Sequence, residues 1–387
     1  MPRPKHLELK MKRSTERILT THTGSLPRPQ SLLDALEASA EGTIHNIAAN
    51  VTGAVASIVR QQVQVGIDVV NDGEMGKPSY ATYVKDRLSG FDGEAAAMAI
   101  ADLADYPEYG ARFMSQGVMQ RLLRPACTGP VTCKDTSAVQ TDIANLKAAL
   151  AQNHAAEGFM SAASPGVISI FLANHYYKKH EDYLAALAEA MRPEYQAISN
   201  AGLILQIDCP DLAMGRHIQF PDASLAEFRK NITAHIDALN YALQGIPAER
   251  CRIHLCWGNY EGPHHRDVPL NDIIDVVFRA NVCGISYEAS NPRHEHEWAV
   301  FDHVTLPEGK VLIPGVIDSV NNFIEHPELV GQRICNVARL VGRENVLAGT
   351  DCGFATVAGY SAVDPKITWA KFQSLAEGAR IASQKLF

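Results

Sequence analysis

The chain has 387 residues, of which 46% are hydrophobic and 20% charged, and its formal net charge at pH 7 is -8. This length suits one large α/β domain or two ordinary domains, and the acidic balance argues against nucleic acid or an anionic membrane as the main partner. No apolar run reaches the roughly 20 residues of a membrane helix. The basic start, MPRPKHLELKMKR, lacks the apolar core of a secretory signal. We therefore expect a cytoplasmic protein, with residues 1–17 as a basic extension that is frayed or docks on another copy of the chain in a homo-oligomer.

Short β-rich runs alternate with longer helical patterns along the chain. We predict eight strands, within 18–25, 67–74, 161–172, 203–210, 252–259, 284–290, 311–318 and 346–353. The helical patterns between them include 31–38, 55–66, 183–202, 225–243 and 328–342. Such alternation indicates a parallel α/β fold, and eight units predict one closed (β/α)8 TIM-like barrel over residues 18–387. An open doubly wound sheet is the alternative, although no G-x-G-x-x-G motif follows the first predicted strand.

One interval, about 75–160, is too long for a single strand–helix unit. Within it, the run RLLRPACTGPVTC (121–133) predicts a hairpin with Gly129 and Pro130 at its turn. We expect this insertion, between the second and third strands, to form a flap over one mouth of the barrel. Since no linker rich in Gly, Ser or Pro interrupts the chain, a single domain with an insertion is predicted.

Polar residues collect where the predicted strands end. In a barrel the loops that follow the strands surround one mouth, and barrel enzymes place their chemistry there. Strand interiors need apolar filling, so a Glu that ends GISYE and a Cys that follows AGTD require another explanation. The polar residues at these strand ends are His22, Ser25, Asp72, Glu74, Asp208, Cys209, His254, Cys256, Glu288, Asp318, Asp351 and Cys352.

A zinc ion would explain four of these residues. His254 and Cys256 are two apart in IHLCWGN, so a strand there would point both side chains to the same face. With Glu288 from the next strand and Cys352 from the last, they would form a Cys2HisGlu set of the kind that binds Zn²⁺. Zinc with one exchangeable ligand lowers the pKa of a thiol and holds it as the nucleophilic thiolate. Each residue alone is more simply interpreted as a buried core side chain, and only the set indicates a metal.

Two acidic strand ends and two histidine-rich loops remain. Glu74 and Asp208 could bind a substrate amine or shuttle a proton, or could serve as a helix cap and a structural ion pair. HEHEW (294–298) and PHH (263–265) resemble ligands of a second metal, but in loops such histidines are more commonly solvated. The eight cysteines are scattered with no Cys-x-x-Cys pair, which predicts reduced thiols rather than a disulfide framework.

Seven motifs, in chain order, resemble the C-terminal catalytic barrel of cobalamin-independent methionine synthases. They are HTGSLPRP, DVVNDGE, QIDCPDL, IHLCWGN, ISYEAS, PGVID and AGTDCGF, and they extend over essentially the whole chain. The resemblance implies a (β/α)8 barrel, methyl or alkyl transfer to a thiol, and a zinc ion held by His254, Cys256, Glu288 and Cys352. It also implies that Ser25 and Glu74 hold the amino-acid part of a homocysteine-like thiol, with Asp208 close by and His22 in the same substrate-binding set.

Two departures from the family pattern qualify the predicted reaction. The histidine that follows the seventh-strand motif in the synthases is not matched, because Ser319 and Val320 follow Asp318. ASNPRHEHEW, PGVID and IEHPELV are closer to short single-barrel members, which include epoxyalkane–coenzyme M transferases. The prediction is zinc-dependent methyl or alkyl transfer to a small thiol, from a folate or a simpler methyl donor, with epoxide ring opening by coenzyme M or a similar thiol as the alternative. A zinc hydrolase and a zinc-free barrel of the uroporphyrinogen decarboxylase type are alternatives from other classes.

Overall fold

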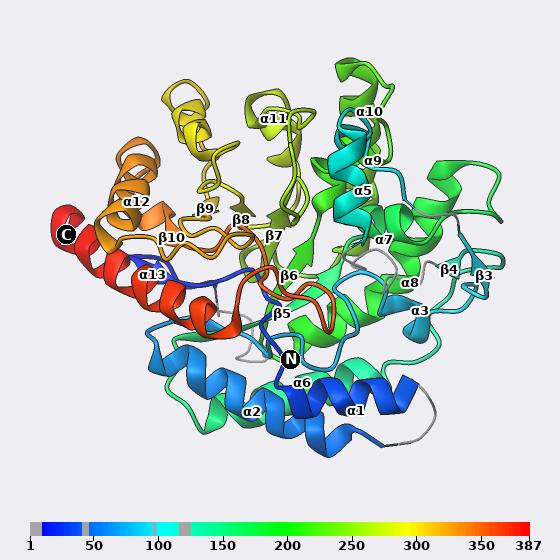
Figure 1. Cartoon of the computed structure of the whole chain (residues 1–387), viewed down its shortest axis with the longest axis horizontal. Coiled ribbons are helices and arrows are strands. Elements are labelled where there is room, and N and C mark those ends of the chain that lie inside the picture. The colour runs from blue at the N-terminus through cyan, green and yellow to red at the C-terminus, as the bar shows by residue number, and fades with distance from the viewer. Residues whose placement is uncertain (1–9, 41–45, 96–97, 116–124) are drawn as a thin grey trace, which may run out of the picture.

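The computed structural model describes residues 10–40, 46–95, 98–115 and 125–387. Six parallel strands form one curled sheet in the order β2-β5-β6-β7-β8-β9, and β1 and β10 form a separate parallel pair (Figure 1). These eight strands are β1 (Leu19–Thr20), β2 (Val69–Val70), β5 (Glu157–Ala163), β6 (Ile204–Asp208), β7 (Cys251–Leu255), β8 (Gly284–Tyr287), β9 (Val311–Pro314) and β10 (Leu347–Ala348). Six of them lie within a predicted run, β7 begins one residue before its run, and β5 overlaps its run only at 161–163. The prediction of a parallel α/β fold is confirmed.

Helices follow most strands and pack in pairs against the outside of the sheet, α2 with α6, α8 with α10 and α12 with α13 (Figure 1). The longer helices are α1 (Gln30–Ala40), α2 (Ala48–Gln64), α5 (Pro107–Ser115), α6 (Ser137–Ala151), α7 (Pro165–Phe171), α8 (His180–Asn200), α10 (Leu225–Ala242), α12 (Pro327–Val341) and α13 (Pro365–Leu386). The short ones are α3 (Val84–Arg87), α4 (Ala101–Ala104), α9 (Gly215–Ile218) and α11 (Ile274–Val277), with 3-10 turns η3 (Pro210–Leu212), η4 (Ala248–Arg250), η5 (Leu270–Asp272), η6 (Glu295–Asp302) and η7 (Arg343–Asn345). Within the described part of the chain, no helix is long and apolar enough to cross a membrane.

The strand predicted over 161–172 is wrong in its second half, where the chain forms a helix. β5 ends at Ala163, and α7 begins two residues later. The side chain of Ser164 accepts a hydrogen bond from the backbone N–H of Val167, and Pro165 occupies the first helical turn. A serine cap followed by proline is a strong helix start. Because α7 is buried on every side, its apolar run has no periodicity that could distinguish it from a strand.

The insertion differs from the hairpin predicted over 121–133. Residues 121–124 lie outside the described residues. The rest pairs with chain further upstream, since β4 (Pro125–Ala126) runs antiparallel to β3 (Gly93–Glu94) and Cys133 forms an antiparallel bridge with Leu88. The prediction of a local hairpin about Gly129 is therefore wrong. The side chain of Tyr260, in the loop after β7, instead packs with residues of α4 and α5, so this part of the insertion covers that loop.

Residues 10–17, the described part of the predicted extension, are docked rather than frayed. The backbone N–H of Met11 donates to the carbonyl of Glu249 at 2.9 Å, and the Ser14 hydroxyl donates to the carbonyl of Val346 at 2.6 Å. The backbone N–H of Lys12 donates to Glu157 at 2.7 Å. These acceptors lie at the amino ends of β7, β10 and β5, so the segment packs across the end of the sheet opposite the predicted site.

Candidate metal centre and substrate pocket

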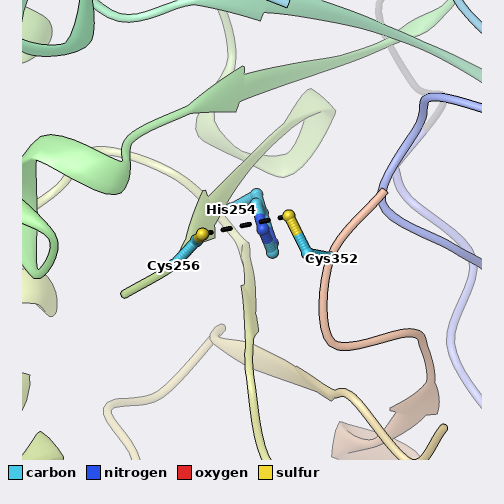
Figure 2. A group of neighbouring side chains, drawn as sticks. All are labelled: His254, Cys256 and Cys352. Carbon is cyan, nitrogen blue, oxygen red and sulfur yellow. Dashed lines mark hydrogen bonds between the residues drawn. The ribbon is translucent and has the colours of Figure 1, made fainter. Parts of the chain in front are cut away.

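Three of the four predicted metal ligands come together at the carboxyl ends of the strands. His254 is in β7, Cys256 directly follows that strand, and Cys352 lies in the loop after β10 (Figure 2). Their ligand atoms all lie within 4.8 Å of one another, and all three side chains are buried. Among the described residues, this is the one group of three or more His, Cys, Asp or Glu with that spacing. The two sulfur atoms are 3.8 Å apart.

The state of the His254 ring suits it to bind a metal. Its Nδ1 lies 3.1 Å from the hydroxyl oxygen of Ser286 on β8, while its Nε2 is buried and has no hydrogen-bond partner. Burial, reinforced by the guanidinium of Arg252, lowers the pKa of His254 to about 3, so the ring is neutral at physiological pH. A neutral imidazole whose Nδ1 is fixed by a neighbour presents the lone pair of Nε2 for coordination.

The two thiols complete a donor set that fits zinc. The contact with Cys352 and burial both raise the pKa of Cys256 well above its usual value, although the backbone N–H of Gly258 donates to its sulfur at 3.2 Å and partly offsets them. A zinc ion compensates thiolate charge and binds two thiolates and an imidazole readily. Tetrahedral zinc with bonds of about 2.3 Å separates two sulfurs by about 3.8 Å, which is the distance found here. A plain thiol–thiol contact has a similar length, so the unpartnered nitrogen of His254 carries the argument.

The fourth predicted ligand, Glu288, lies at the edge of this cluster rather than within it. It follows β8, and its carboxylate accepts hydrogen bonds from the backbone N–H of Trp257 at 2.9 Å and from the side chain of Asn291 at 2.8 Å. Burial and the neighbouring Cys256 raise the pKa of Glu288 well above its usual value. The carboxylate therefore fixes the residue that follows Cys256 and lies within its electrostatic reach.

A small pocket opens beside the metal centre. Its walls contain all three clustered residues and three of the predicted substrate residues, so the strand ends converge as the parallel arrangement requires. The lining residues are Thr23, Ser25, Glu74, Tyr80, Asp208, Pro210, His254, Cys256, Asn259, Cys352, Gly353 and Thr356.

Glu74 enters this pocket from an uncommon backbone conformation. Its φ is +58°, in the left-handed region that residues with a side chain rarely adopt. Its backbone is held on both sides, since its N–H donates to Asp72 at 3.0 Å and its carbonyl accepts from Arg28 at 2.8 Å. One carboxylate oxygen accepts from the Ser161 hydroxyl at 2.7 Å, and the other is buried without a partner. The second oxygen is therefore available to a ligand.

Asp208, at the end of β6, is the second acidic group of the pocket. Burial and the nearby Glu74 raise the pKa of Asp208 to about 8. The side chain of Gln206 donates to its carboxyl group at 2.8 Å and in turn accepts from the guanidinium of Arg252 at 2.8 Å. Asp208 is thus held in one orientation and can gain or lose a proton near neutral pH.

The structure does not bring His22 to the pocket. Its Nε2 lies 2.7 Å from the side-chain oxygen of Gln62, and its ring packs against Phe159 and Phe372. In contrast, Tyr80 and Asn259 line the pocket although no sequence pattern singled them out. Both lie in loops, where the backbone path depends on distant contacts rather than on local periodicity.

The histidine-rich loops form a second buried cluster, which we term the Asp267 network. Its members are Asp267, His217, His264, His294 and Glu297. One carboxylate oxygen of Asp267 lies 2.9 Å from His264 and 3.0 Å from His294, and the other lies 3.2 Å from His217. The second ring nitrogen of His294 lies 2.8 Å from Glu297. These histidines therefore face a carboxylate, and they do not form a ligand group of the kind found at the metal centre.

The Asp267 network supports the loop that carries Cys256. The ring of His294 stacks on Trp257 with 4.0 Å between ring centroids, and the indole N–H donates to the carbonyl of Val268 at 2.7 Å. Although burial disfavours a charged ring, hydrogen bonds to Asp267 and Glu297 raise the pKa of His294 to about 10. A positively charged ring therefore lies beneath Trp257, the residue after Cys256.

Comparison with known proteins assigns the family. The model of the cobalamin-independent synthase catalytic domain matches residues 18–370. The chain belongs to the cobalamin-independent methionine synthase family. Its sequence is 24% identical over 373 residues to a methionine synthase of Saccharolobus islandicus, with 95% of each chain covered. It is 22% identical over 386 residues to the methionine synthase of Thermococcus kodakarensis, covering 95% of this chain and 94% of that one.

Solved structures of this family share the fold. A B12-independent methionine synthase from a Shewanella species, in complex with selenomethionine, superposes with a TM-score of 0.73 at 19% identity, covering 96% of this chain and 99% of that one. A B12-independent methionine synthase described as putative, from Listeria monocytogenes, gives 0.65 at 18% identity, covering 94% and 98%. The predicted family and the predicted enzyme class, a methyltransferase, are thus confirmed.

Proposed function

We propose that this protein transfers a methyl group to a small amino-acid thiol of the homocysteine type, with zinc held by His254, Cys256 and Cys352 and by Glu288 as an exchangeable fourth ligand. The observation that carries the proposal is the buried, unpartnered Nε2 of His254, which faces two thiols in a pocket shared with Glu74 and Asp208. The homocysteine part of the proposal follows the names of the relatives, which are methionine synthases.

The architecture that we propose around this site is a closed eight-stranded barrel. Two parallel bridges, Leu312 with Val346 and Gly315 with Gly349, link β9 to β10. At the other edge, the backbone N–H of Asp68, just before β2, donates to the carbonyl of Thr20 in β1 at 3.1 Å. These contacts support a ring in which all eight strand ends surround one pocket.

Each polar group of the pocket has a role in this proposal. Zinc, when bound, would lower the pKa of the substrate thiol and stabilise its thiolate form. The free carboxylate oxygen of Glu74 would accept a hydrogen bond from the substrate ammonium group, next to the Ser25 hydroxyl. Asp208, whose pKa is about 8, would take the proton that the thiol loses, because a base works best when its pKa is near the ambient pH.

The alternative reactions fit this pocket less well. Coenzyme M carries a sulfonate, and the unpartnered carboxylate oxygen of Glu74 would repel that anion where it would attract an ammonium group. A zinc hydrolase would need an acidic metal-bound water, and two thiolate ligands place negative charge on the metal that makes such water less acidic. An amino-acid thiol as the nucleophile is the substrate class that both features favour.

The test of the metal centre is zinc per chain, measured in the wild type, in Cys352→Ser and in Cys335→Ser. Cys335 is a buried thiol in α12 that belongs neither to the pocket lining nor to the ligand group, and it serves as the matched control. We expect zinc to be lost from Cys352→Ser alone. Zinc-edge X-ray absorption of the wild type should then gain sulfur with homocysteine, but not with coenzyme M, glutathione or cysteine. Equal zinc in the wild type and in Cys352→Ser would overturn the proposed site.

The role of Glu74 can be tested separately with Glu74→Gln. A hydrogen bond to a charged group is worth about 1.5–3 kcal/mol, so KM for the thiol should rise about 10- to 100-fold while zinc content is unchanged. KM should rise more for homocysteine than for a thiol of similar size that lacks the amino group. An equal rise in KM for both thiols would show that Glu74 does not bind the substrate ammonium group.

A further inference from the structure

Tyr80 lies in the pocket wall on a segment that is fixed to the metal-binding loop. Its backbone N–H donates to the carbonyl of Thr356 at 3.3 Å, and the preceding residue, Ser79, forms an antiparallel bridge with Val357. Thr356 and Val357 follow Cys352 closely in the same loop. The ring of Tyr80 also packs edge-on against Phe171, with centroids 5.6 Å apart. These contacts hold the phenol in a fixed position relative to the metal centre.

The hydroxyl group of Tyr80 is available to a substrate. Among the residues that the structure describes, it has no hydrogen-bond partner, whereas the hydroxyl of Thr23 in the same wall donates to the carbonyl of Thr350. Burial, with the nearby thiols of Cys256 and Cys352, raises the pKa of Tyr80 well above its usual value. The phenol therefore keeps its proton in the resting pocket.

A proton-donating group is needed for one class of alkyl donor and not for another. When sulfur attacks the transferred carbon, the bond to the leaving atom breaks and its electron pair stays on that atom. An amine nitrogen or an epoxide oxygen then needs a proton, whereas a sulfonium donor leaves as a neutral thioether. Ser319, which follows Asp318 after β9, does not supply this proton, because its hydroxyl donates to Asn259 at 2.9 Å.

We propose that Tyr80 donates its hydroxyl proton to the leaving atom, and that the donor is therefore a molecule whose leaving atom is a basic nitrogen or oxygen. This inference rests on the proposed thiol alkylation. The sulfur–carbon bond forms as the bond from carbon to the leaving atom breaks, and the leaving atom takes the proton of Tyr80. The phenolate regains a proton from Asp208, which took it from the thiol. The thiol proton thus ends on the leaving group, and the protein returns to its starting state.

The decisive experiment compares two classes of electrophile in wild type and Tyr80→Phe. One class contains an N-methylated tetrahydrofolate and an epoxide, and the other contains methyl iodide and trimethylsulfonium, which leave without a proton. We expect Tyr80→Phe to lower kcat about 10²- to 10⁴-fold with the first class and to change it little with the second. Equal losses with both classes, or no loss with either, would overturn the role. Turnover of the wild type with sulfonium donors alone would overturn the donor class and leave the proposed function intact.

A structural role for Tyr80 is separated from the proposed one by measurements that do not depend on turnover. Zinc per chain and calorimetric affinity for the thiol should both match the wild type in Tyr80→Phe. The control is Tyr176→Phe, whose ring is 49% exposed and lies outside the pocket, and it should keep full activity with every electrophile. Loss of zinc or of thiol affinity in Tyr80→Phe would show that the ring shapes the site and would contradict proton donation.

Discussion

The metal centre and the Asp267 network are both buried groups of polar side chains in loops that follow parallel strands. In the metal centre, the Nε2 of His254 has no partner and faces two thiols. In the Asp267 network, every histidine lies within 3.2 Å of a carboxylate oxygen of one shared aspartate. The first group lacks a positive charge at its centre, and the second already contains its counter-charge.

This difference separates a ligand set from a structural network more clearly than residue type does. Histidine-rich loops attract attention in the sequence, yet two of their rings, His264 and His294, face the carboxylate of Asp267 within the protein. Each region also contains a residue with a side chain and a left-handed backbone, Glu74 at the pocket and His264 in the network. Backbone strain and buried polar atoms without a hydrogen-bond partner therefore occur in both regions, since the ring nitrogens of His217 also lack one. The region that would bind a metal is marked by the unpartnered Nε2 of His254 together with two thiols within ligand distance of it.

The largest expected effect comes from replacing one histidine ring in each region in turn. His254→Gln should lose essentially all bound zinc and all activity, because the remaining donors cannot complete a tetrahedral shell. His294→Gln, in the Asp267 network, should keep a full equivalent of zinc when folded. Zinc per chain by mass spectrometry of the native protein and by metal analysis checks both variants. Loss of zinc from both to the same extent would mean that the comparison does not hold.

The next effect concerns stability rather than metal. Asp267→Asn removes the charge that faces His217, His264 and His294, and breaking a buried charge pair costs about 3–5 kcal/mol. The free energy of unfolding in urea measures this change. The control is Asp237→Asn, an exposed partner of Arg279, for which the expected change is below about 1 kcal/mol. A small loss for Asp267→Asn would show that the three rings are neutral and independent of that charge.

A third effect distinguishes the network by its pH dependence. Because contacts with Asp267 and Glu297 raise the pKa of His294 from 6.5 to about 10, the folded state is stabilised by the protonated ring. That contribution is complete below pH 6.5 and is lost as the pH rises through 10. The stability difference between wild type and His294→Phe should therefore shrink over this range, by about 4 kcal/mol. A difference that stays constant with pH would indicate a neutral ring that only stacks on Trp257.

The smallest effect tests how the metal centre is supported. Ser286→Ala removes the oxygen that fixes the Nδ1 of His254, and loss of such an outer partner weakens metal affinity about 10- to 100-fold. Competition with a chelator measures the change. Ser290→Ala is the matched control, since Ser290 is a buried serine near the site whose hydroxyl has no partner. Equal affinities in the two variants would remove Ser286 from the support of the metal.

The parallel α/β fold and the clustering of His254, Cys256 and Cys352 were accessible from sequence because both depend on local spacing. Buried parallel strands are continuous apolar runs, and the polar residue that ends each run marks the edge at which the strands meet. The spacing of two between His254 and Cys256 directs both toward the same face. The same alternation explains why His22 is not in the pocket. Thr23 and Ser25 line the pocket, so the neighbouring side chain of His22 points away from it.

Features that depend on distant contacts could not be predicted. Tyr80 reaches the pocket because its segment pairs with residues 356–357, far along the chain. No sequence pattern singles out Asp267, and only the fold brings it against His217 and His294. The helix α7 was taken for a strand because a fully buried segment has no polar face to reveal its period.

The backbone of Glu74 has a consequence for the evolution of this chain. Glycine would adopt a φ of +58° without the steric cost of about 1–2 kcal/mol that a residue with a Cβ incurs. Selection for heat resistance alone would therefore favour replacing this carboxylate, and only a demand for catalysis would retain it. In a laboratory library screened for thermal tolerance, glycine should replace Glu74 in early rounds. The same variants should be the first to lose substrate binding.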